Sequence, residues 1–510
     1  MLQLKMNELS IEKIFEDRQI DEKWLNASRA DFLPASMLLN MERALTLIKT
    51  HLDKKWVIVV DSDCDGICSS AIAYIGLTRL GATNVELIKF DGKTHGIEGQ
   101  VDKIPACDVL LLPDAGTNDV AACKTLFDNG TTILILDHHE VEVENPYALI
   151  VNPHQVACQY PNKSLCGTTV TWKVFNELVD MMDTLDLCAV ATVGDKMALS
   201  PLENIGFVRE GMANIVNPYL LAHFSNDDRL ADKSLDAGII GWYLAPLINA
   251  CIRVGEVEDM LGIVNAMAGV VDGNETISHL LKMRNAQNRK INACLPTIVL
   301  NTVDDAPIVI CERPPSLPKS MTGLVANKLV NHYNKPVLLG SINGHGYFAG
   351  SARNINNAAF GLKETLAETA LMDFVAGHSN AHGFGMSSEN IAALKEALAD
   401  LNVQEQNIVI DGLLNTVDDV EKFLWQVLEV NGWFECDKDP VKLGVVVDAI
   451  SEFTTMKDKH CKFMWHGIPV IMWNTTEPPQ VGDVLVVQPS VNTWMGRQSL
   501  QLISQAVVKI

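Results

Sequence analysis

The first residues whose types and spacing suit chemistry are three aspartates at alternating positions. Asp61, Asp63 and Asp65 directly follow the apolar run 56–60. Three carboxylates this close together repel one another unless a positive charge lies among them, and carboxylate oxygens are the ligands that hard divalent cations prefer. This stretch predicts a cation site, and a solvated turn after a strand is the alternative interpretation.

Acids or histidines also end three later apolar runs. These residues are Asp114 after 109–113, Asp137, His138 and His139 after 131–136, and Asp195 at the end of 187–195. With the three aspartates they form a set of oxygen donors and imidazoles that suits two Mn²⁺ or Mg²⁺ ions better than a structural zinc ion. Two such ions activate a water molecule and hold the attacking and leaving oxygens of a phosphate in line. The residues therefore predict hydrolysis of a phosphodiester or a phosphoanhydride.

The segments that position these residues alternate between strand and helix. Runs such as 57–60, which is β-branched throughout, predict parallel strands covered on both faces, and helical segments such as 69–77 and 169–175 separate them. The alternation predicts an α/β fold with a largely parallel sheet, whose strands end at the edge where ligands gather. The run 187–195 is weaker as a strand, since its alanine and leucine content suits a helix equally well.

The 510 residues are too many for one ordinary core. The region 206–295 has a helical pattern, a second α/β pattern starts with a strand at 297–300, and short β-rich runs near the end predict a small barrel. We expect five parts: a catalytic domain with a helical lead at 1–205, a helical extension at 206–295, a second α/β domain at 296–402, an acidic connector at 403–436, and an OB-like barrel at 437–510.

Composition narrows the function classes. The formal net charge of −23 argues against a protein that coats nucleic acid through a broad basic surface, although nine Lys/Arg against four Asp/Glu in 275–353 allow a local basic groove. Twelve cysteines without a C-x-x-C pair indicate reduced core thiols. The apolar runs fall short of the roughly 18 residues that span a bilayer, and the first residues lack a signal-peptide core. We expect a cytoplasmic protein without membrane contact.

Four motifs occur in the order of a known family. They are D-S-D-C-D-G at 61–66, P-D-A-G around Asp114, L-D-H-H at 136–139 and V-G-D ending at Asp195. In this order they resemble the four motifs of the DHH phosphoesterase superfamily.

Later blocks extend the resemblance over most of the chain. G-S-A-R at 350–353 and A-G-H-S-N-A-H-G at 376–383 resemble the two blocks of the associated DHHA1 domain. P-L-I-N-A-C-I-R at 246–253 looks like a block of the RecJ branch, the single-strand-specific DNA exonucleases. The tail at 492–502 is similar to the end of the RecJ oligonucleotide-binding barrel.

The resemblance implies a dinuclear Mn²⁺ or Mg²⁺ centre. Its expected ligands are Asp61, Asp63, Asp65, Asp114, His138 and Asp195. It also implies that His139 faces the scissile phosphate and that Asp137 orients a ligand histidine. The residues expected to bind nucleic-acid phosphates are Ser351, Arg353, His378 and Arg253. Whether Asp61 binds metal directly or stands behind Asp63 and Asp65 stays open.

The chain departs from the family pattern at Leu247, Ile252 and Ala376, where the family usually has Arg, Gly and Gly. These departures indicate a divergent or phage-borne member with weakened contacts to phosphate. They leave the predicted metal ligands intact.

The function expected from residues and resemblance together is a single-stranded-DNA exonuclease that acts in the 5′-to-3′ direction, with DNA-repair or replication proteins as partners. One alternative is a phosphodiesterase for small molecules or short oligonucleotides, against which the extra barrel argues. Another is a catalytically inactive nucleic-acid-binding relative, which should have lost some of the acids. Three tryptophans of the predicted barrel, Trp465, Trp473 and Trp494, either stack on bases or fill its core.

Overall fold

The computed structural model describes residues 2–231, 233–355, 358–403, 408–457, 459–494 and 497–509. The chain divides into two compact units. Unit 1 comprises Met1–Asn7 and Asn285–Gly412, and unit 2 comprises Glu8–Arg284 and Leu413–Ile510. Each unit is therefore built from two separate stretches of the chain.

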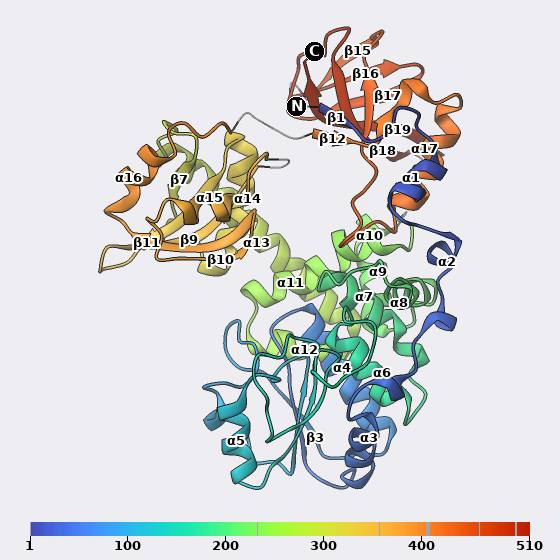
Figure 1. Ribbon diagram of the computed structural model, residues 1–510, viewed down its shortest axis with the longest axis vertical. Helices are drawn as coiled ribbons and strands as arrows, with labels where there is room; N and C mark the ends of the chain where they lie inside the picture. Colours follow the sequence, from blue (N-terminus) through green and yellow to red (C-terminus); the bar gives the residue numbers. More distant parts are fainter. Residues whose placement is uncertain are drawn as a thin grey trace. The chain divides into compact units, whose positions relative to one another are not determined.

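A five-stranded parallel sheet lies in unit 2 (Figure 1). Its strands are β2 (Trp56–Val59), β3 (Val85–Ile88), β4 (Val109–Pro113), β5 (Thr132–Leu136) and β6 (Leu149–Val151), in the order β3-β2-β4-β5-β6. Every neighbouring pair is parallel. The predicted parallel sheet is confirmed, and the loops after β2, β4 and β5 meet at its carboxyl edge.

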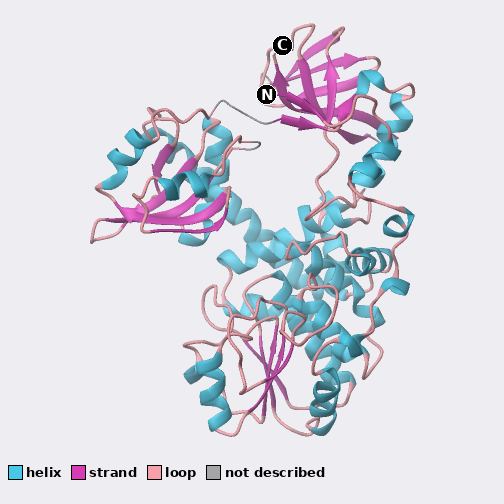
Figure 2. Ribbon diagram, in the orientation of Figure 1, coloured by secondary structure: helices cyan, strands magenta, loops and turns pink. Residues whose placement is uncertain are grey.

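Helices cover both faces of this sheet (Figure 2). On one face lies α5 (Val120–Asp128), whose Ala122 and Cys123 join Val57, Leu110 and Ile133 in a buried cluster. The helices on the other face are α3 (Met41–Thr50), α4 (Cys64–Arg79) and α6 (Gly167–Asn176). All residues of β2 and β4 are buried because both faces are covered.

A helix occupies the run that the sequence left open between strand and helix. It is α7 (Leu185–Gly194), and Asp195 is its C-cap. All residues from Leu185 to Val193 are buried. A helix that is buried on every side has no amphipathic period, which explains why the sequence pattern alone did not separate the two interpretations.

The region 206–295 is helical, as expected. Its helices are α8 (Leu202–Ala213), α9 (Pro218–Asn226), α10 (Ala237–Ile239), α11 (Ala245–Val254), α12 (Val257–Met267) and α13 (Gly273–Asn301), while the helical lead contains α1 (Ile11–Asp17) and α2 (Glu22–Leu25). The strand predicted at 297–300 is wrong, because α13 continues through it. Ile291, Cys294 and Ile298 are buried at intervals of three and four residues, so the packing of one helical face overrides the strand preference of Thr-Ile-Val.

Unit 1 holds a second five-stranded sheet. Its strands are β7 (Val309–Glu312), β8 (Val337–Ile342), β9 (Tyr347–Arg353), β10 (Phe374–His378) and β11 (Ala381–Ser387), in the order β10-β11-β9-β8-β7. The helices beside it are α14 (Thr322–Tyr333), α15 (Leu362–Glu368) and α16 (Asn390–Ala397). Phe348 and Phe384 pack in its core with ring centroids 5.1 Å apart. The unit also contains β1 (Leu2–Leu4), which pairs in parallel with β12 (Ile408–Ile410).

The last part of the chain forms a seven-stranded sheet of order β13-β14-β18-β19-β17-β16-β15. Its strands are β13 (Gly412–Leu413), β14 (Leu443–Val446), β15 (Ser451–Met456), β16 (His460–Trp465), β17 (Ile468–Met472), β18 (Val484–Trp494) and β19 (Arg497–Val508). Trp465 is buried and belongs to the core, whereas Trp473 is 51% exposed. The side chain of Trp494 and residues 495–496 of the barrel-like tail motif lie outside the described residues.

The segment expected as an acidic connector, 403–436, is more ordered than its charge indicates. It contains β12, β13 and the helix α17 (Val420–Asn431), while 404–407 lie outside the described residues. Buried Phe423, Leu424 and Val427 give α17 an apolar face beneath its acidic one.

Among the described residues, the helical stretch Ala237–Val254 is long and apolar enough to cross a membrane, but half of it is buried inside the protein, as in a core helix.

All twelve cysteines are free thiols, and ten of them are buried.

Candidate metal centre

The loop after β2 and the start of α4 hold the first three aspartates. Asp63 is the N-cap of α4, and its Oδ1 accepts the backbone N–H of Gly66 at 2.8 Å. A Cβ on Gly66 would lie 2.5 Å from the Cβ of Asp61, so glycine allows α4 to begin this close to the loop. Burial raises the pKa of Asp63, and the charges of Asp61 and Asp65 raise it further. The three acids therefore repel one another in the folded protein, as expected.

The N-terminus of α6 holds Asp65, which is fully buried. Its Oδ2 accepts the N–H of Gly167 at 2.6 Å and its Oδ1 accepts the N–H of Thr168 at 2.8 Å. These donors have no partner within the helix, and the helix dipole favours a negative charge at this end. The start of α6 thus fixes one carboxylate of the cluster.

The turn after β4 places Asp114 in the interior without a hydrogen-bond partner. The backbone of Asp114 has a φ of 70°, and its N–H donates to the carbonyl of Leu136 at 2.8 Å. Among the described residues, neither carboxylate oxygen has a hydrogen-bond partner. Burial raises the pKa of Asp114 well above its usual range, and Asp65 and Asp63 contribute. A buried carboxylate without a partner is costly, and a cation is the partner that these surroundings fit.

One histidine nitrogen lies at the centre of the cluster. The Nε2 atom of His138 is 3.2 Å from Asp114 Oδ1, 3.5 Å from Asp195 Oδ2 and 3.6 Å from Asp65 Oδ2. Adjacent ligands of an octahedral ion at about 2.1 Å lie about 3 Å apart. Each of the three carboxylate atoms therefore lies near His138 Nε2 at a distance close to that between two ligands of one divalent ion.

The C-terminus of α7 presents Asp195. A helix C-terminus carries a partial negative charge, which makes it an unfavourable place for a carboxylate. Burial raises the pKa of Asp195 to about 8, and the charges of Asp65 and Asp63 also raise it. This carboxylate therefore also needs a positive partner.

A buried carboxylate, Asp137, organises the two histidines after β5. Its Oδ1 accepts the N–H groups of His138 at 2.7 Å and His139 at 3.1 Å, and its Oδ2 accepts the N–H of Thr117 at 3.1 Å. The Nδ1 of His139 also lies 2.8 Å from Asp137 Oδ1. This hydrogen bond raises the pKa of His139 to about 9. Burial would raise the pKa of Asp137, but the hydrogen bonds and the charge of His139 hold it well below its usual value.

A histidine outside the predicted set joins the cluster. His95, in the loop after β3, has its Nδ1 2.7 Å from Asp61 Oδ2, while the N–H of Gly96 donates to Asp61 Oδ1 at 3.1 Å. Three groups have ligand atoms within 4.8 Å of one another: Asp114, His138 and His139; Asp61, Asp63 and His95; and Asp65, His138 and Asp195. The only sequence signal for His95 was its position in a Thr-His-Gly loop. Nothing in the sequence indicated that the N–H groups of Gly167 and Thr168 bind Asp65, apart from a predicted helix near them.

A buried lysine near this loop binds the loop backbone. Lys89 is buried, and its Nζ donates to the carbonyls of Phe90 at 2.6 Å and Gly92 at 3.0 Å. Lys89 therefore stabilises the loop backbone. Lys93, in the same loop, is exposed to solvent.

Three of the residues expected to bind phosphate lie together in unit 1. Register pairs Arg353 on β9 with Ala381 on β11, and Ala381 with His378 on β10, so all three stand in one row across the sheet. Ser351 lies two residues before Arg353 on the same strand, and the Arg353 guanidinium lies against Gly323 at the start of α14. Burial lowers the pKa of Arg353.

The fourth residue expected to bind phosphate is Arg253, in unit 2. It stands in the last turn of α11, a helix that packs on α4 and α7. Asp65 lies in α4, and Asp195 is the C-cap of α7. The segment 246–253 therefore packs against the two helices that position these acids. Leu247, where the family usually has Arg, is fully buried in this packing.

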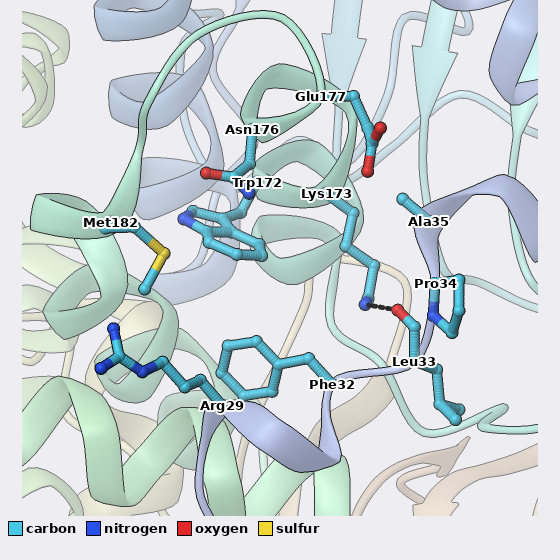
Figure 3. A pocket seen from close by; sticks show the side chains of 10 residues that line it. All are labelled: Arg29, Phe32, Leu33, Pro34, Ala35, Trp172, Lys173, Asn176, Glu177 and Met182. Carbon is cyan, nitrogen blue, oxygen red and sulfur yellow. Dashed lines mark hydrogen bonds between the residues drawn. The ribbon is translucent and has the colours of Figure 1, made fainter.

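A cavity of about 320 Å³ lies at the far end of α6 from Asp65 (Figure 3). Phe32 and Trp172 line it, and Lys173 donates to the carbonyl of Leu33 at 2.8 Å. Lys173 also forms a buried ion pair with Glu203 at 2.6 Å. No residue of the metal cluster lines this cavity, and its contacts fasten the segment 29–35 to α6.

The close approach of α6 to Asp114 gives a first prediction. A Cβ on Gly167 would lie 2.6 Å from the Cβ of Asp114 and 2.7 Å from its Cα, so Gly167→Ala has to displace the backbone at the cluster. We expect a loss of about 1–3 kcal/mol in stability and an activity lowered on the order of 10²-fold, measured by chemical unfolding and by nuclease assay.

The matched control for that change is Gly262→Ala. Gly262 lies inside α12 and has no atom within 4 Å of an added Cβ. Alanine there should leave activity unchanged and stabilise the helix by up to about 1 kcal/mol. Equal activity in the two variants would show that the spacing between α6 and Asp114 does not matter.

Residues 55–192 match the DHH family, N-terminal domain. The matched stretch contains every residue of the cluster except Asp195, which follows it closely.

The similarity to relatives extends well beyond the matched stretch 55–192. A prophage-derived protein of Bacillus subtilis, YorK, named for single-strand DNA-specific exonuclease activity, is 29% identical over 440 residues, covering 78% of this chain and 76% of YorK. The single-stranded-DNA-specific exonuclease RecJ of Escherichia coli is 22% identical over 541 residues, covering 94% of this chain and 92% of RecJ.

Solved structures agree on the fold. RecJ of Thermus thermophilus in complex with Mn²⁺ superposes with a TM-score of 0.74 at 20% identity, covering 100% of this chain and 80% of that one. A RecJ bound to manganese has a TM-score of 0.55 at 24% identity, covering 72% and 94%. The chain is thus RecJ-like in fold, matches the DHH family model over 55–192, and differs from these relatives at most positions.

Proposed function

We propose that this chain is a metal-dependent exonuclease that hydrolyses phosphodiester bonds of single-stranded DNA. The observation that carries the proposal is the convergence of Asp65, Asp114 and Asp195 on the Nε2 atom of His138. The relatives are named for this activity, and similar RecJ structures contain Mn²⁺ or Mg²⁺. The proposed ligands of two such ions are Asp61, Asp63, Asp65, Asp114, His138 and Asp195.

The surroundings of the cluster support hydrolysis of a phosphate ester. Two divalent ions bound there would lower the pKa of a water molecule and neutralise the charge of the phosphate. His139 adds a cation of the chain itself, because its Nδ1 is held by Asp137 and its side chain is 49% exposed. The Nε2–H of the same ring, which Asp137 does not hold, can then donate a charge-assisted hydrogen bond to the scissile phosphate.

Contacts to the rest of the strand form a second part of the proposal. Ser351, Arg353 and His378 would bind phosphates of the DNA backbone. Register places Arg353 and His378 in one row, Ser351 lies two residues before Arg353 on β9, and Arg353 offers a planar fork of donors. We assign Arg253 to the same role. The 5′-to-3′ direction and DNA-repair or replication proteins as partners follow from the resemblance to RecJ.

The test of the proposed function is a nuclease assay with a 3′-labelled single strand. Purified protein with Mn²⁺ should shorten the strand from its 5′ end, spare a blunt duplex, and stop when EDTA is added. Shortening of a 5′-labelled strand from its 3′ end would reverse the proposed direction. Cleavage of cyclic dinucleotides without cleavage of DNA would instead support the small-molecule phosphodiesterase.

The proposed phosphate contact of Arg353 gives a second prediction. Arg353→Ala should weaken the binding of single-stranded DNA and reduce the slope of log K against log salt by about 1, because one phosphate contact is lost. Fluorescence anisotropy over a range of salt concentrations measures this slope. The control is Arg43→Ala, since Arg43 is exposed and donates to Asn40. Identical slopes for both variants and the wild type would remove Arg353 from the DNA-binding surface.

A further inference from the structure

We propose that His95 is a direct ligand of the metal ion held by Asp61 and Asp63. The three side chains offer ligand atoms within 4.8 Å of one another, separately from the group around His138. His95 is the only imidazole in that group. The proposal rests on the two-ion centre of the proposed function and completes the coordination of its second ion.

The loop that carries His95 is fastened to the aspartate loop. The hydroxyl of Ser62 donates to the carbonyl of Thr94 at 2.6 Å, and the N–H of Thr94 donates back to Ser62 Oγ at 2.9 Å. On the other side of His95, the N–H of Gly96 donates to Asp61 Oδ1. Hydrogen bonds on both sides therefore hold the imidazole beside the acids, although the side chain itself is 48% exposed.

A glycine and a buried anchor fix the far side of the same loop. Gly96 has a φ of 69°, and a Cβ there would collide with the carboxylate of Asp119. That carboxylate accepts the N–H of Ile97 at 2.6 Å, and the Ile97 side chain is fully buried. These contacts fix the conformation of the loop and therefore the position of His95 beside Asp61.

The distances suit coordination. His95 Nδ1 lies 2.7 Å from Asp61 Oδ2, close to the separation of about 3 Å between adjacent ligands of one octahedral ion. An ion bound to both atoms would replace the hydrogen bond between them. Imidazole is a better ligand for Mn²⁺ than for Mg²⁺, so His95 should favour Mn²⁺ at this position.

Asp61 and Asp63 also need a cation. The Asp61 carboxylate is 1% exposed and Asp65 is fully buried, so two buried acids flank Asp63. An ion bound by Asp61, Asp63 and a neutral imidazole would lie among these charges and reduce their repulsion. The same arrangement answers the question left open by the sequence, since it makes Asp61 a direct ligand.

The alternative role for His95 is to position Asp61 through a hydrogen bond without touching the ion. His95→Asn separates the two roles. An asparagine amide can replace Nδ1 as the donor to Asp61, but it is a poor ligand for Mn²⁺. His51→Asn is the control, because His51 Nδ1 contacts the carbonyl of Leu47 in α3, outside the cluster.

The experiment is Mn²⁺ titration of the full chain by calorimetry, with electron spin-echo measurement of nitrogen coupling to Mn²⁺. Wild type and His51→Asn should bind two ions and show two coordinated imidazoles. His95→Asn should keep one ion at unchanged affinity, weaken the other at least about tenfold, and show one imidazole.

The outcomes separate the two proposals. Two ions at unchanged affinity in His95→Asn, or a single coordinated imidazole in the wild type, would overturn the role of His95 and leave the proposed function in place. No bound Mn²⁺ in the wild type would overturn both. The nitrogen count of the wild type needs no variant, so a folding defect in His95→Asn does not obscure the result.

Discussion

Replacing Asp114 with asparagine should abolish hydrolysis and raise the melting temperature of the metal-free protein. Asp114 is buried, and neither carboxylate oxygen has a hydrogen bond within the part of the chain that the structure describes, so its charge costs folding free energy. Asparagine keeps the shape and tolerates the φ of 70°. We expect a gain of about 1–3 kcal/mol in EDTA and an activity lowered on the order of 10³-fold.

The stabilisation by Asp114→Asn should depend on pH. The raised pKa means that folded Asp114 binds its proton more tightly than the unfolded chain does, so the wild type loses stability as pH rises above the ordinary aspartate pKa of 3.8. The difference in melting temperature should be small in acid and grow toward neutral pH. Thermal unfolding in EDTA at several pH values measures it.

Asp195→Asn is the comparison for this change. It should also lose activity but gain less stability, because the Asp195 carboxylate is 29% exposed and already solvated in part. Added Mn²⁺ should stabilise the wild type more than either variant. An Asp114→Asn protein that melts below the wild type in EDTA would contradict an uncompensated charge at this position.

The second large effect is expected for Asp137→Asn. The two oxygens of Asp137 accept hydrogen bonds from three backbone N–H groups and from the His139 ring. An asparagine amide would turn an NH₂ group toward one of these donors and remove the charge. We expect a loss of about 2 kcal/mol in stability and an activity lowered about 10–100-fold, because both histidines lose their orientation.

A titration of His139 by NMR would show the cause of that loss. The hydrogen bond to Asp137 raises the pKa of His139 to about 9, so the pKa in Asp137→Asn should fall toward the ordinary value of 6.5. Asp186→Asn is the control, since Asp186 is buried and accepts the backbone N–H groups of Leu187, Val216 and Asn217 away from the cluster. It should lose stability but keep activity, and equal activity losses in both variants would argue against a specific role for Asp137.

Much of the cluster could be predicted from the sequence because it follows from strand order. Acids at the ends of β2, β4 and β5 must meet at one edge of a parallel sheet, whatever the details of the loops. Asp195 was predicted at the same place although its carrier is a helix, since either element ends at that edge. The position predicted for Asp195 was therefore the same whether 187–195 formed a strand or a helix.

The remaining features depend on contacts that no local pattern records. His95 reaches Asp61 because Ser62 and Thr94 tie two loops together. The strand predicted at 297–300 failed because the buried face of α13 outweighs local preference. The lack of hydrogen bonds at Asp114 could not be predicted either. It arises because the N–H groups at the start of α6, on Gly167 and Thr168, donate to Asp65 and not to Asp114.

The pairing of β1 with β12 has a consequence for how the protein is made. Leu2 lies opposite Ile408, so β1 pairs with a strand that is synthesised much later than β1 itself. Unit 2 likewise needs residues from Leu413 onward. Neither unit can complete its fold during most of translation, and contacts this distant in sequence form slowly. Refolding from denaturant should therefore be slower than for a chain whose units are each continuous.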